Sequence, residues 1–545
     1  PAGKPAERWP LQWLARADWR GRLQEADLPV EVRQVIETVT VKSRLLNCEK
    51  AEVTDELIAH FEDGNLRGQS FGKLLQDFGD PLATAKLIRL GKIRNRSMFT
   101  KFGRLSAALG LGAIGAYVIA WWVFNMGRPE PSVDYLAEFN APMLDVPEDK
   151  KAWNIYRDVW AKHGFCEGQK GRFEEIFHRD PDDKSVVRIV RVGDPGWSVA
   201  IRKLKNSQDL LDGFREGSKL PHLGVTFFAD PNQYSPEDRA ALYPDAPAGE
   251  PLSNSMELAD IDPEVDKLMS GSMFSVLLPH VQSFRSAARI LVADSRWAIS
   301  QDDKERVVQN IEAIMGLSQQ AAEPKFLVCA LVGMAVSQIG YDLIDDVLAD
   351  DPDLFDDAQL ARIQKAIERV KPYEMVDFSG ERLSLKDIVQ RVYTDDGKGD
   401  GRITWQGMEV FRMLNSAWGT GSETRGGVMD TVLDTNLIGG PVAMFSMPSR
   451  KETMQKLNDL VDQVEQHFGT PWWEDSQLDE IEEQLERDKG KNVVVASLFP
   501  TVSQIHAATE RAVANRDGMR MAIAVYRFRL HHGDWPASAD DLKGK

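Results

Sequence analysis

Hydrophobic positions along this chain recur mostly at helical spacing, and one long run carries no charged residue at all. Residues 105–126 read LSAALGLGAIGAYVIAWWVFNM, without Asp, Glu, Lys, Arg or His. A helix that rises about 1.5 Å per residue needs about 20 such residues to cross the hydrocarbon core of a bilayer. The pattern therefore predicts a transmembrane helix over residues 105–126. A cleaved signal peptide fits less well, because about 100 residues of foldable sequence precede the run.

The charges that flank this run predict its orientation. Residues 86–104 contain seven Lys and Arg and no acidic residue, whereas Arg128 on the far side is followed by Glu130, Asp134 and Glu138. Cytoplasmic flanks of membrane helices are enriched in Lys and Arg. We therefore expect the N-terminus in the cytoplasm and about 420 residues on the outer side of the membrane.

Small side chains recur every four residues within the predicted span, at Ala108, Gly112, Ala116 and Ala120. A ridge of this kind lets another helix backbone approach closely, so these four residues are a candidate helix-packing face in the membrane. The alternative is background composition, because Gly and Ala are frequent in membrane helices in any case. The sequence leaves both interpretations open.

The net charge of −18 is unevenly distributed. Residues 1–104 contain 18 Lys and Arg against 14 Asp and Glu, while the remainder contains 48 against 70. The basic segment suits an anionic lipid leaflet, and the acidic remainder argues against a nucleic-acid partner. Cys48 falls on the predicted reducing side, so at most one intrachain disulfide is open, between Cys166 and Cys329.

Residues 28–96 predict a compact unit of three or four helices before the membrane. One of its helices is expected to end at Gly64, a residue type that commonly terminates helices. The apolar face of that helix consists of Val53, Leu57, Ile58 and Phe61.

Two further helices follow from capping signals. Ser70 is the expected N-cap of a short helix that runs to Phe78 and ends at Gly79. Asp80 is the expected cap of the next helix, with Pro81 at its first position, where the missing N–H costs nothing.

This segment resembles the HAAS domain, a small helical module at the cytoplasmic end of bacterial membrane proteins, over residues 50–92. The matching residues are Glu56, His60, Phe61, Glu62, Asp63, Gly79, Asp80, Pro81 and Ala85. The resemblance implies a signalling or regulatory module without catalysis, at residues 1–100. It also implies a bacterial inner membrane, with the bulk of the chain periplasmic.

Beyond the span, the pattern predicts a linker and three further segments. Residues 127–147 contain four prolines and are expected to form a semi-extended linker. Residues 148–256 combine the amphipathic stretch AWNIYRDVWAKHGF with the strand-like SVVRIVRV, which indicates a minor α+β part. Residues 257–430 are expected to be helical, as is a C-terminal segment at 431–545.

A second apolar helix is expected at LVCALVGMAVSQIGYDLIDDVL. Its uninterrupted apolar core, residues 326–336, is 11 residues long, about half a bilayer, which predicts a buried core helix and not a second span. Successive antiparallel helix pairs would build a repeat-like stack, a form suited to binding proteins. The predicted fold class is therefore mainly α: a small N-terminal bundle, one transmembrane helix, and a large outer helical, repeat-like region with a minor α+β part.

One loop, TDDGKGDGRITWQG, offers a weak candidate metal site at Asp396, Asp400 and Thr404. Aligned with a calcium-binding EF-hand loop, Asp396 stands first and Asp400 fifth. However, Lys398 occupies the third position and Gly407 the twelfth, so a carboxylate and the bidentate Glu are both missing. We therefore favour a plain Gly/Asp turn between two helices, with Asp396 accepting backbone N–H bonds.

The C-terminal stretch RDGMRMAIAVYRFRLHHGDWPASADDL resembles a motif of pseudopilin-like proteins and of large planctomycete-type single-pass membrane proteins of unknown function. The matching residues are Ala522, Tyr526, Arg527, His532, Gly533, Trp535, Pro536 and Leu542. In those families the motif continues further, so the resemblance implies a longer C-terminus. It implies an architecture and no activity.

The sequence contains no Gly-rich phosphate loop, GxSxG elbow, HExxH pair or kinase-type motif set. We therefore predict no cofactor and no catalytic residues. The leading hypothesis is a non-catalytic scaffold or accessory subunit of an envelope complex, with membrane lipid, other envelope proteins or further copies of the chain as partners. The alternatives are a sensor coupled to the HAAS-like module and an extracytoplasmic enzyme of unrecognised type.

Overall fold

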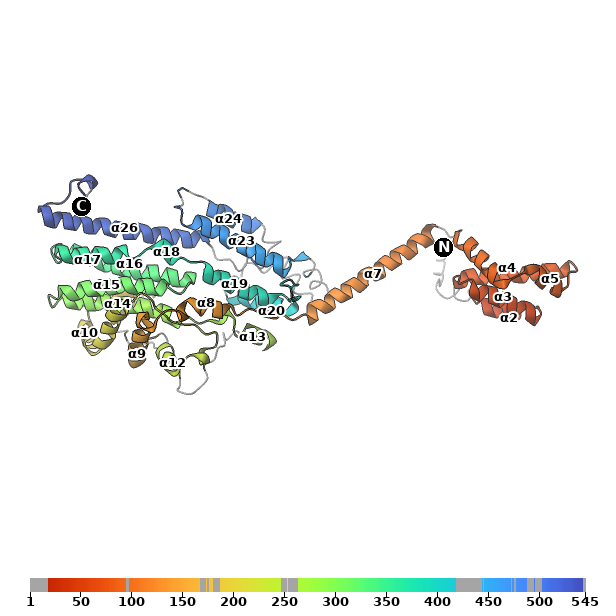
Figure 1. Cartoon of the computed structure of the whole chain (residues 1–545), viewed down its shortest axis with the longest axis horizontal. Helices are drawn as coiled ribbons and strands as arrows, with labels where there is room; N and C mark the ends of the chain where they lie inside the picture. The colour runs from red at the N-terminus through yellow and green to blue at the C-terminus, as the bar shows by residue number, and fades with distance from the viewer. Residues whose placement is uncertain are drawn as a thin grey trace, which may run out of the picture. The chain divides into compact units, whose positions relative to one another are not determined.

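The computed structural model describes residues 18–94, 98–166, 173, 176–179, 187–246, 252, 263–417, 444, 446–471, 473–474, 477–487, 495 and 502–542 (Figure 1). The described part is helical apart from one two-stranded sheet, which confirms the mainly α prediction. The chain divides into two compact units, Pro1–Tyr117 and Val118–Lys545. The long helix α7 (Met98–Met126) contributes to both.

The first unit is a small helical bundle with a hydrophobic core of its own. Its helices are α2 (Trp19–Glu25), α3 (Val30–Lys42), α4 (Asn47–Leu66), α5 (Phe71–Phe78), α6 (Pro81–Arg94) and the start of α7. The core is centred on fully buried apolar side chains of α3 and α4: Val32, Ile36, Val39, Val53 and Phe61.

The predicted helix ends around α5 and α6 are confirmed, although the Ser70 side chain, at the N-cap of α5, forms no capping hydrogen bond. Gly79 has φ 75° directly after α5, a conformation that favours glycine, and the Asp80 carboxylate accepts the N–H groups of Leu82 and Ala83 at the start of α6. The prediction that Gly64 ends its helix is wrong, because α4 continues to Leu66. A Cβ at Gly64 would lie 2.6 Å from the Leu74 side chain, so close packing against α5 explains this glycine.

The second unit begins with a correction. The proline-rich stretch predicted as a semi-extended linker contains helix α8 (Tyr135–Leu144). Phe139 of α8 contacts the rings of Phe227 and Phe326, at centroid distances of 6.0 and 4.6 Å. The buried Asn140 exchanges hydrogen bonds with the backbone of Phe227. Tertiary contacts therefore order a segment whose local sequence favours an extended chain.

The predicted amphipathic helix and one predicted strand are present. Helix α9 (Trp153–His163) buries Trp153, Tyr156 and Trp160, and β2 (Val187–Ile189) pairs antiparallel with β1 (Phe177–Arg179). The short elements that complete this region are η1 (Glu148–Lys150), α10 (Trp197–Asn206), α11 (Gln208–Gly217), η3 (Pro231–Gln233), α12 (Pro236–Leu242), α13 (Pro263–Met269) and η4 (Met273–Ser275).

The largest core forms around three long helices, α14 (Pro279–Ile299), α15 (Lys304–Ala322) and α16 (Leu327–Asp350). These helices contact one another, and α17 (Asp357–Glu368) and α26 (Val502–His532) run beside them (Figure 1). Pro352 lies in the turn between α16 and α17, and Asp356 caps α17 together with Gln359.

A second core joins the remaining elements of this unit to the end of α7. They are α18 (Pro372–Met375), α19 (Ser379–Val392), α20 (Trp405–Ala417), α23 (Arg450–Phe468) and α24 (Gln477–Arg487), with η6 (Ala539–Leu542) after α26. The predicted boundary at residues 430 and 431 lies outside the described residues.

Two described helices are long and apolar enough to cross a membrane, by length and composition. One is α7, whose window Ala108–Met126 has a mean hydropathy of 1.5 and is 11% buried inside the protein. The other is α16, with a mean hydropathy of 1.7, and 67% of it is buried against neighbouring helices.

Candidate functional site

The candidate site is the loop between α19 and α20, at residues 393–404. Its two ends meet in an antiparallel bridge between Tyr393 and Ile403, both of which are buried. Thr394 adds a backbone hydrogen bond from its N–H to the carbonyl of Arg402, at 3.0 Å. The loop therefore closes at its base, with its acidic residues at the tip.

The acidic residues at the tip accept backbone hydrogen bonds from the loop itself. Asp396 Oδ1 accepts the N–H groups of Lys398 and Asp400, at 2.8 and 3.1 Å. Asp395 Oδ1 accepts those of Gly397 and Gly399, at 2.8 and 3.2 Å. Both glycines have positive φ angles, 77° and 85°, which only glycine adopts without strain. The expected role of Asp396 as a turn acceptor is confirmed.

The first turn of α23 supplies a cation and two N–H groups to the same loop. Arg450 is buried, and its Nη1 donates to Asp395 Oδ2 at 2.7 Å. The N–H of Arg450 donates to the Gly401 carbonyl, and the N–H of Lys451 donates to Asp400 Oδ1 at 3.2 Å. Negative charge at a helix N-terminus is favourable, so the loop and α23 stabilise each other.

The electrostatics follow from these contacts. Hydrogen bonds from the N–H groups of Gly397 and Gly399, together with the Arg450 guanidinium, lower the pKa of Asp395. Partial burial raises the pKa of Asp400, but hydrogen bonds from Ser449, Gly401 and Lys451 outweigh it and lower that pKa overall. Both carboxylates are therefore ionised around neutral pH and already hold hydrogen-bond donors.

Thr404, the third residue of the candidate metal site, begins α20. Its buried Oγ1 accepts the N–H of Gly407 at 2.9 Å, as a helix cap does. A Cβ at Gly407 would lie 1.9 Å from the Val392 carbonyl oxygen, so the glutamate of a calcium-binding loop does not fit there. Within the described residues, no group of three or more His, Cys, Asp or Glu is arranged to hold a metal ion.

The C-terminal end of α7 is built into the core beside this loop. Ala120 and Phe124 are buried, and the Phe124 ring lies 6.3 Å from the ring of Trp405. At Gly127, a Cβ would lie 3.2 Å from the side chains of both Thr394 and Thr404. That Cβ would also lie 2.5 Å from the Val123 carbonyl oxygen, which explains the glycine, and the threonine contacts place the end of the apolar helix directly against the acidic loop.

The predicted ridge of small residues divides at this junction. Ala120 contacts the chain's own core, whereas Ala108, Gly112 and Ala116 are exposed. A side chain at Gly112 would meet no described atom within 4 Å. Nothing in the described part of the chain therefore occupies the first three positions of the ridge, Ala108, Gly112 and Ala116.

Gln390 of α19 forms hydrogen bonds with the backbone of the segment that follows α7. Its side-chain oxygen accepts the N–H groups of Ser132 and Val133, at 3.1 and 3.2 Å, and its amide donates to the Val133 carbonyl at 2.9 Å. Gln390 is fully buried and also donates to Asp387, which accepts the N–H of Met273. Sequence reasoning missed Gln390 and Arg450, because their partners lie 257 and 55 residues away.

The burial of two further polar side chains, Glu381 and His280, could not be predicted from the sequence. Glu381 of α19 accepts the N–H of Leu327, the first residue of α16, at 2.6 Å, while its other oxygen finds no donor among the described residues. Burial raises the pKa of Glu381 to about 7, against the effect of that hydrogen bond. His280 of α14 is fully buried beside Phe227, and burial lowers its pKa to about 3.

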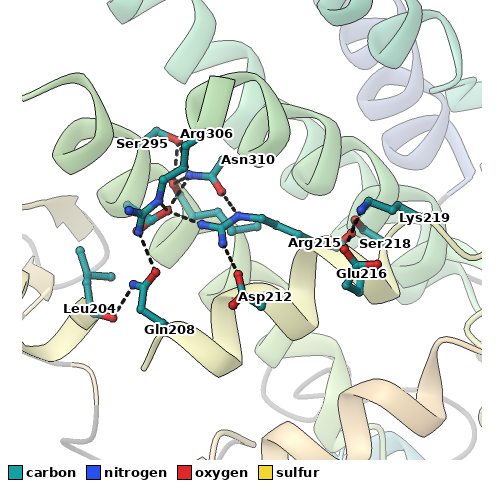
Figure 2. A network of polar contacts seen from close by, with 12 residues as sticks. Leu204, Gln208, Asp212, Arg215, Glu216, Ser218, Lys219, Ser295, Arg306 and Asn310 are labelled. Atoms are coloured by element: carbon teal, nitrogen blue, oxygen red, sulfur yellow. Dashed lines mark hydrogen bonds and ion pairs between the residues drawn. The ribbon is translucent and has the colours of Figure 1, made fainter. Parts of the chain in front are cut away.

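A buried ion network joins α11, α14 and α15 in the larger core (Figure 2). Asp294, with no exposed surface, accepts hydrogen bonds from Arg215 Nη2 at 2.6 Å, from Arg306 Nε at 2.8 Å and from Asn310 Nδ2 at 2.9 Å. Arg215 Nε donates in turn to Asn310 Oδ1 at 2.8 Å. Because every member is satisfied by another, the network fits a structural role.

The cysteines and the described pocket offer no catalytic arrangement. Cys166 Sγ donates to the Pro279 carbonyl at 3.2 Å, and Cys329 is a buried thiol of α16, so the two do not form a disulfide. A small apolar hollow beside α8 is lined mainly by Phe139, Met143, Val225 and Phe227.

No family model, curated protein or solved structure matches this chain. The resemblances to the HAAS domain and to the pseudopilin-type motif therefore stay predictions.

Proposed function

We propose that this chain is a single-pass membrane protein whose unit Val118–Lys545 is a non-catalytic scaffold or accessory subunit of an envelope complex. The observation that supports this proposal most directly is the difference in burial between the two parts of α7. Its outer end is fixed in the protein core by Ala120 and Phe124, whereas 11% of the window Ala108–Met126 is buried. The exposed remainder is apolar and suits lipid.

The second apolar helix supports a single span. The most apolar window of helix α16 is 67% buried, and the helix contacts α14, α15 and α26. Its apolar surface is therefore used inside the protein, as expected for a core helix. We place the N-terminal unit in the cytoplasm because the basic flank of residues 86–104 precedes the span. The inner membrane of a bacterium and a periplasmic outer unit follow as parts of the same proposal.

Purification from native membranes, followed by cross-linking, tests the scaffold role. We expect the full chain to copurify with other envelope proteins at a fixed stoichiometry. A strictly solitary monomer, with no cross-linked partner, would contradict the proposal. Alanine variants of the network residues in Figure 2 are not suitable probes, because they would alter the core and not a binding surface.

A sensor is the second candidate, and a specific observation favours it. Trp405 contacts Phe124 of α7, and Gln390 binds the backbone of the segment that follows α7. A rearrangement around the acidic loop would therefore act directly on the membrane helix. A sensor needs two states that a ligand populates differently. Deletion of residues 1–94 would then abolish a response and leave envelope assembly intact. If assembly fails instead, the N-terminal unit is structural.

A further inference from the structure

We propose that the exposed face of α6 lies on the anionic lipid surface of the membrane as an interfacial helix. The inference rests on the proposed membrane span of α7 and adds a second, peripheral contact with lipid. Three lines of observation carry it: the side chains on that face, their lack of partners among the described residues, and the short connection to α7.

Apolar and basic side chains alternate along one side of α6. Leu82, Lys86, Leu90 and Arg94 follow each other at intervals of four residues, so they form a row on one face of the helix. All four are exposed, and Leu87 beside them is 70% exposed. A soluble helix would normally turn such leucines toward a core.

The opposite face of α6 already meets the bundle. Ala85 is buried there, Ile88 packs against the same core, and α6 contacts α3. Lys92 lies on this inner side, where its Nζ bonds to Glu52 at 3.0 Å and to Glu56 at 3.1 Å. The helix therefore has one face committed to the protein and one face that the protein leaves open.

No described residue neutralises the charge on the open face of α6. Lys86, Arg89 and Arg94 form no ion pair with any described residue, and residues 81–104 contain no Asp or Glu. Cations that lie just inside a membrane are attracted by anionic lipid headgroups. Long basic side chains also let their alkyl stems lie along the apolar layer while their charges reach the headgroups.

The chain keeps α6 near the membrane. Only three residues separate Arg94 from Met98, the first residue of α7, and a fully extended connection of that length spans at most roughly 14 Å. The apolar window of α7 begins at Ala108, after Lys101 and Arg104. Ten residues of α7, roughly 15 Å of helix, separate Met98 from that window, so the end of α6 lies within roughly 30 Å of it. A helix with leucines on one side can reach the interface from there and lie about 5–10 Å deep in it.

The full chain in nanodiscs tests the inference. In a Cys48→Ser background, Leu90→Cys receives an environment-sensitive fluorophore, while the two other cysteines are buried. In discs of equal phosphatidylglycerol and phosphatidylcholine, we expect a blue shift of its emission and quenching by doxyl-labelled lipid. The matched control is Leu66→Cys, an 84% exposed leucine at the end of α4, which should remain in water. Leu82→Cys provides a second position on the proposed face.

The second part of the experiment tests the contribution of the basic side chains. Combined Lys86→Glu, Arg89→Glu and Arg94→Glu should abolish the blue shift at position 90, as should discs of phosphatidylcholine alone at high salt. An unshifted label in anionic discs overturns the inference. A blue shift in detergent that grows with protein concentration also overturns it, because it would show that a second copy of the chain covers the exposed face of α6. A chain that does not enter nanodiscs at all contradicts the membrane span itself, a separate outcome.

Discussion

The Arg450 guanidinium lies 2.7 Å from the Asp395 carboxylate, with the Arg450 side chain 5% exposed and that of Asp395 16% exposed. This pair joins the first turn of α23 to the acidic loop that lies against the C-terminal end of α7. A cation in an EF-hand loop would come from solvent, whereas here the chain supplies a positive charge of its own. The loop is therefore ordered by protein contacts.

Removal of that charge should loosen the loop. In Arg450→Ala we expect faster amide hydrogen exchange at Gly397 and Gly399, because Asp395 loses the partner that holds its carboxylate in place. Hydrogen exchange with mass spectrometry on the full chain measures this. The control is Arg412→Ala, which breaks the more exposed pair with Glu409 and should leave the loop unchanged. Equal effects of the two variants would show that Arg450 has no special role.

Calcium should not bind this loop at sub-millimolar concentration. Lys398 stands where a ligand oxygen belongs, Gly407 has no room for the bidentate glutamate, and Asp396 and Asp400 hold N–H groups. Isothermal titration of the full chain in detergent checks this expectation. Micromolar binding that Asp400→Ala abolishes would contradict it.

Stability should fall as the pH rises through the titration of Glu381. The folded state raises this pKa from 4.5 to about 7, so between these values the folded chain keeps a proton that the unfolded chain releases. The stabilising effect of the protonated form is complete below about pH 4.5 and lost above pH 7, a difference of roughly 3 kcal/mol. Glu381→Gln keeps an acceptor for the Leu327 N–H and should remove this part of the pH dependence. Denaturant unfolding at pH 5 and pH 8 gives the free energy of unfolding of the wild type and of the variant. Identical pH profiles of the two proteins would refute the assignment to Glu381.

The buried network should be sensitive to loss of its only fully buried carboxylate. Asp294→Asn leaves the guanidinium groups of Arg215 and Arg306 close together in the core, which should cost about 3–5 kcal/mol of unfolding free energy. Asp212→Asn removes the exposed partner of Arg215 and should cost no more than about 1 kcal/mol. Denaturant unfolding of the full chain, followed by circular dichroism, measures both losses. Similar losses in both variants would argue against a structural network.

The sequence predicted those features that depend on neighbouring residues. Asp80, Pro81 and Gly79 act within one turn of the helix ends that they define, so their roles could be predicted locally. Gly64 could not, since the contact that explains it comes from Leu74 of the next helix.

Long-range contacts account for the other differences. Helix α8 forms in a proline-rich stretch because Phe139 and Asn140 meet residues about 90 positions later, and local propensity contains no trace of that contact. The same holds for the candidate site. Asp396 and Asp400 stand out in the sequence as a turn, but the partner that satisfies the loop, Arg450, belongs to another helix. Glu381 likewise looks like an ordinary helix residue until α16 covers it.

The central claim is that α7 alone crosses the membrane with the N-terminus inside. Labelling of single cysteines in spheroplasts, whose inner membrane is intact, tests this claim most directly. Native Cys48 reports the N-terminal unit, and Gln309→Cys and Asp350→Cys report exposed positions before α16 and at its last residue. With a membrane-impermeant maleimide, we expect both introduced cysteines to react and Cys48 to react only after permeabilisation. Reaction of Cys48 in intact cells, or of only one of the two introduced cysteines, would contradict the account.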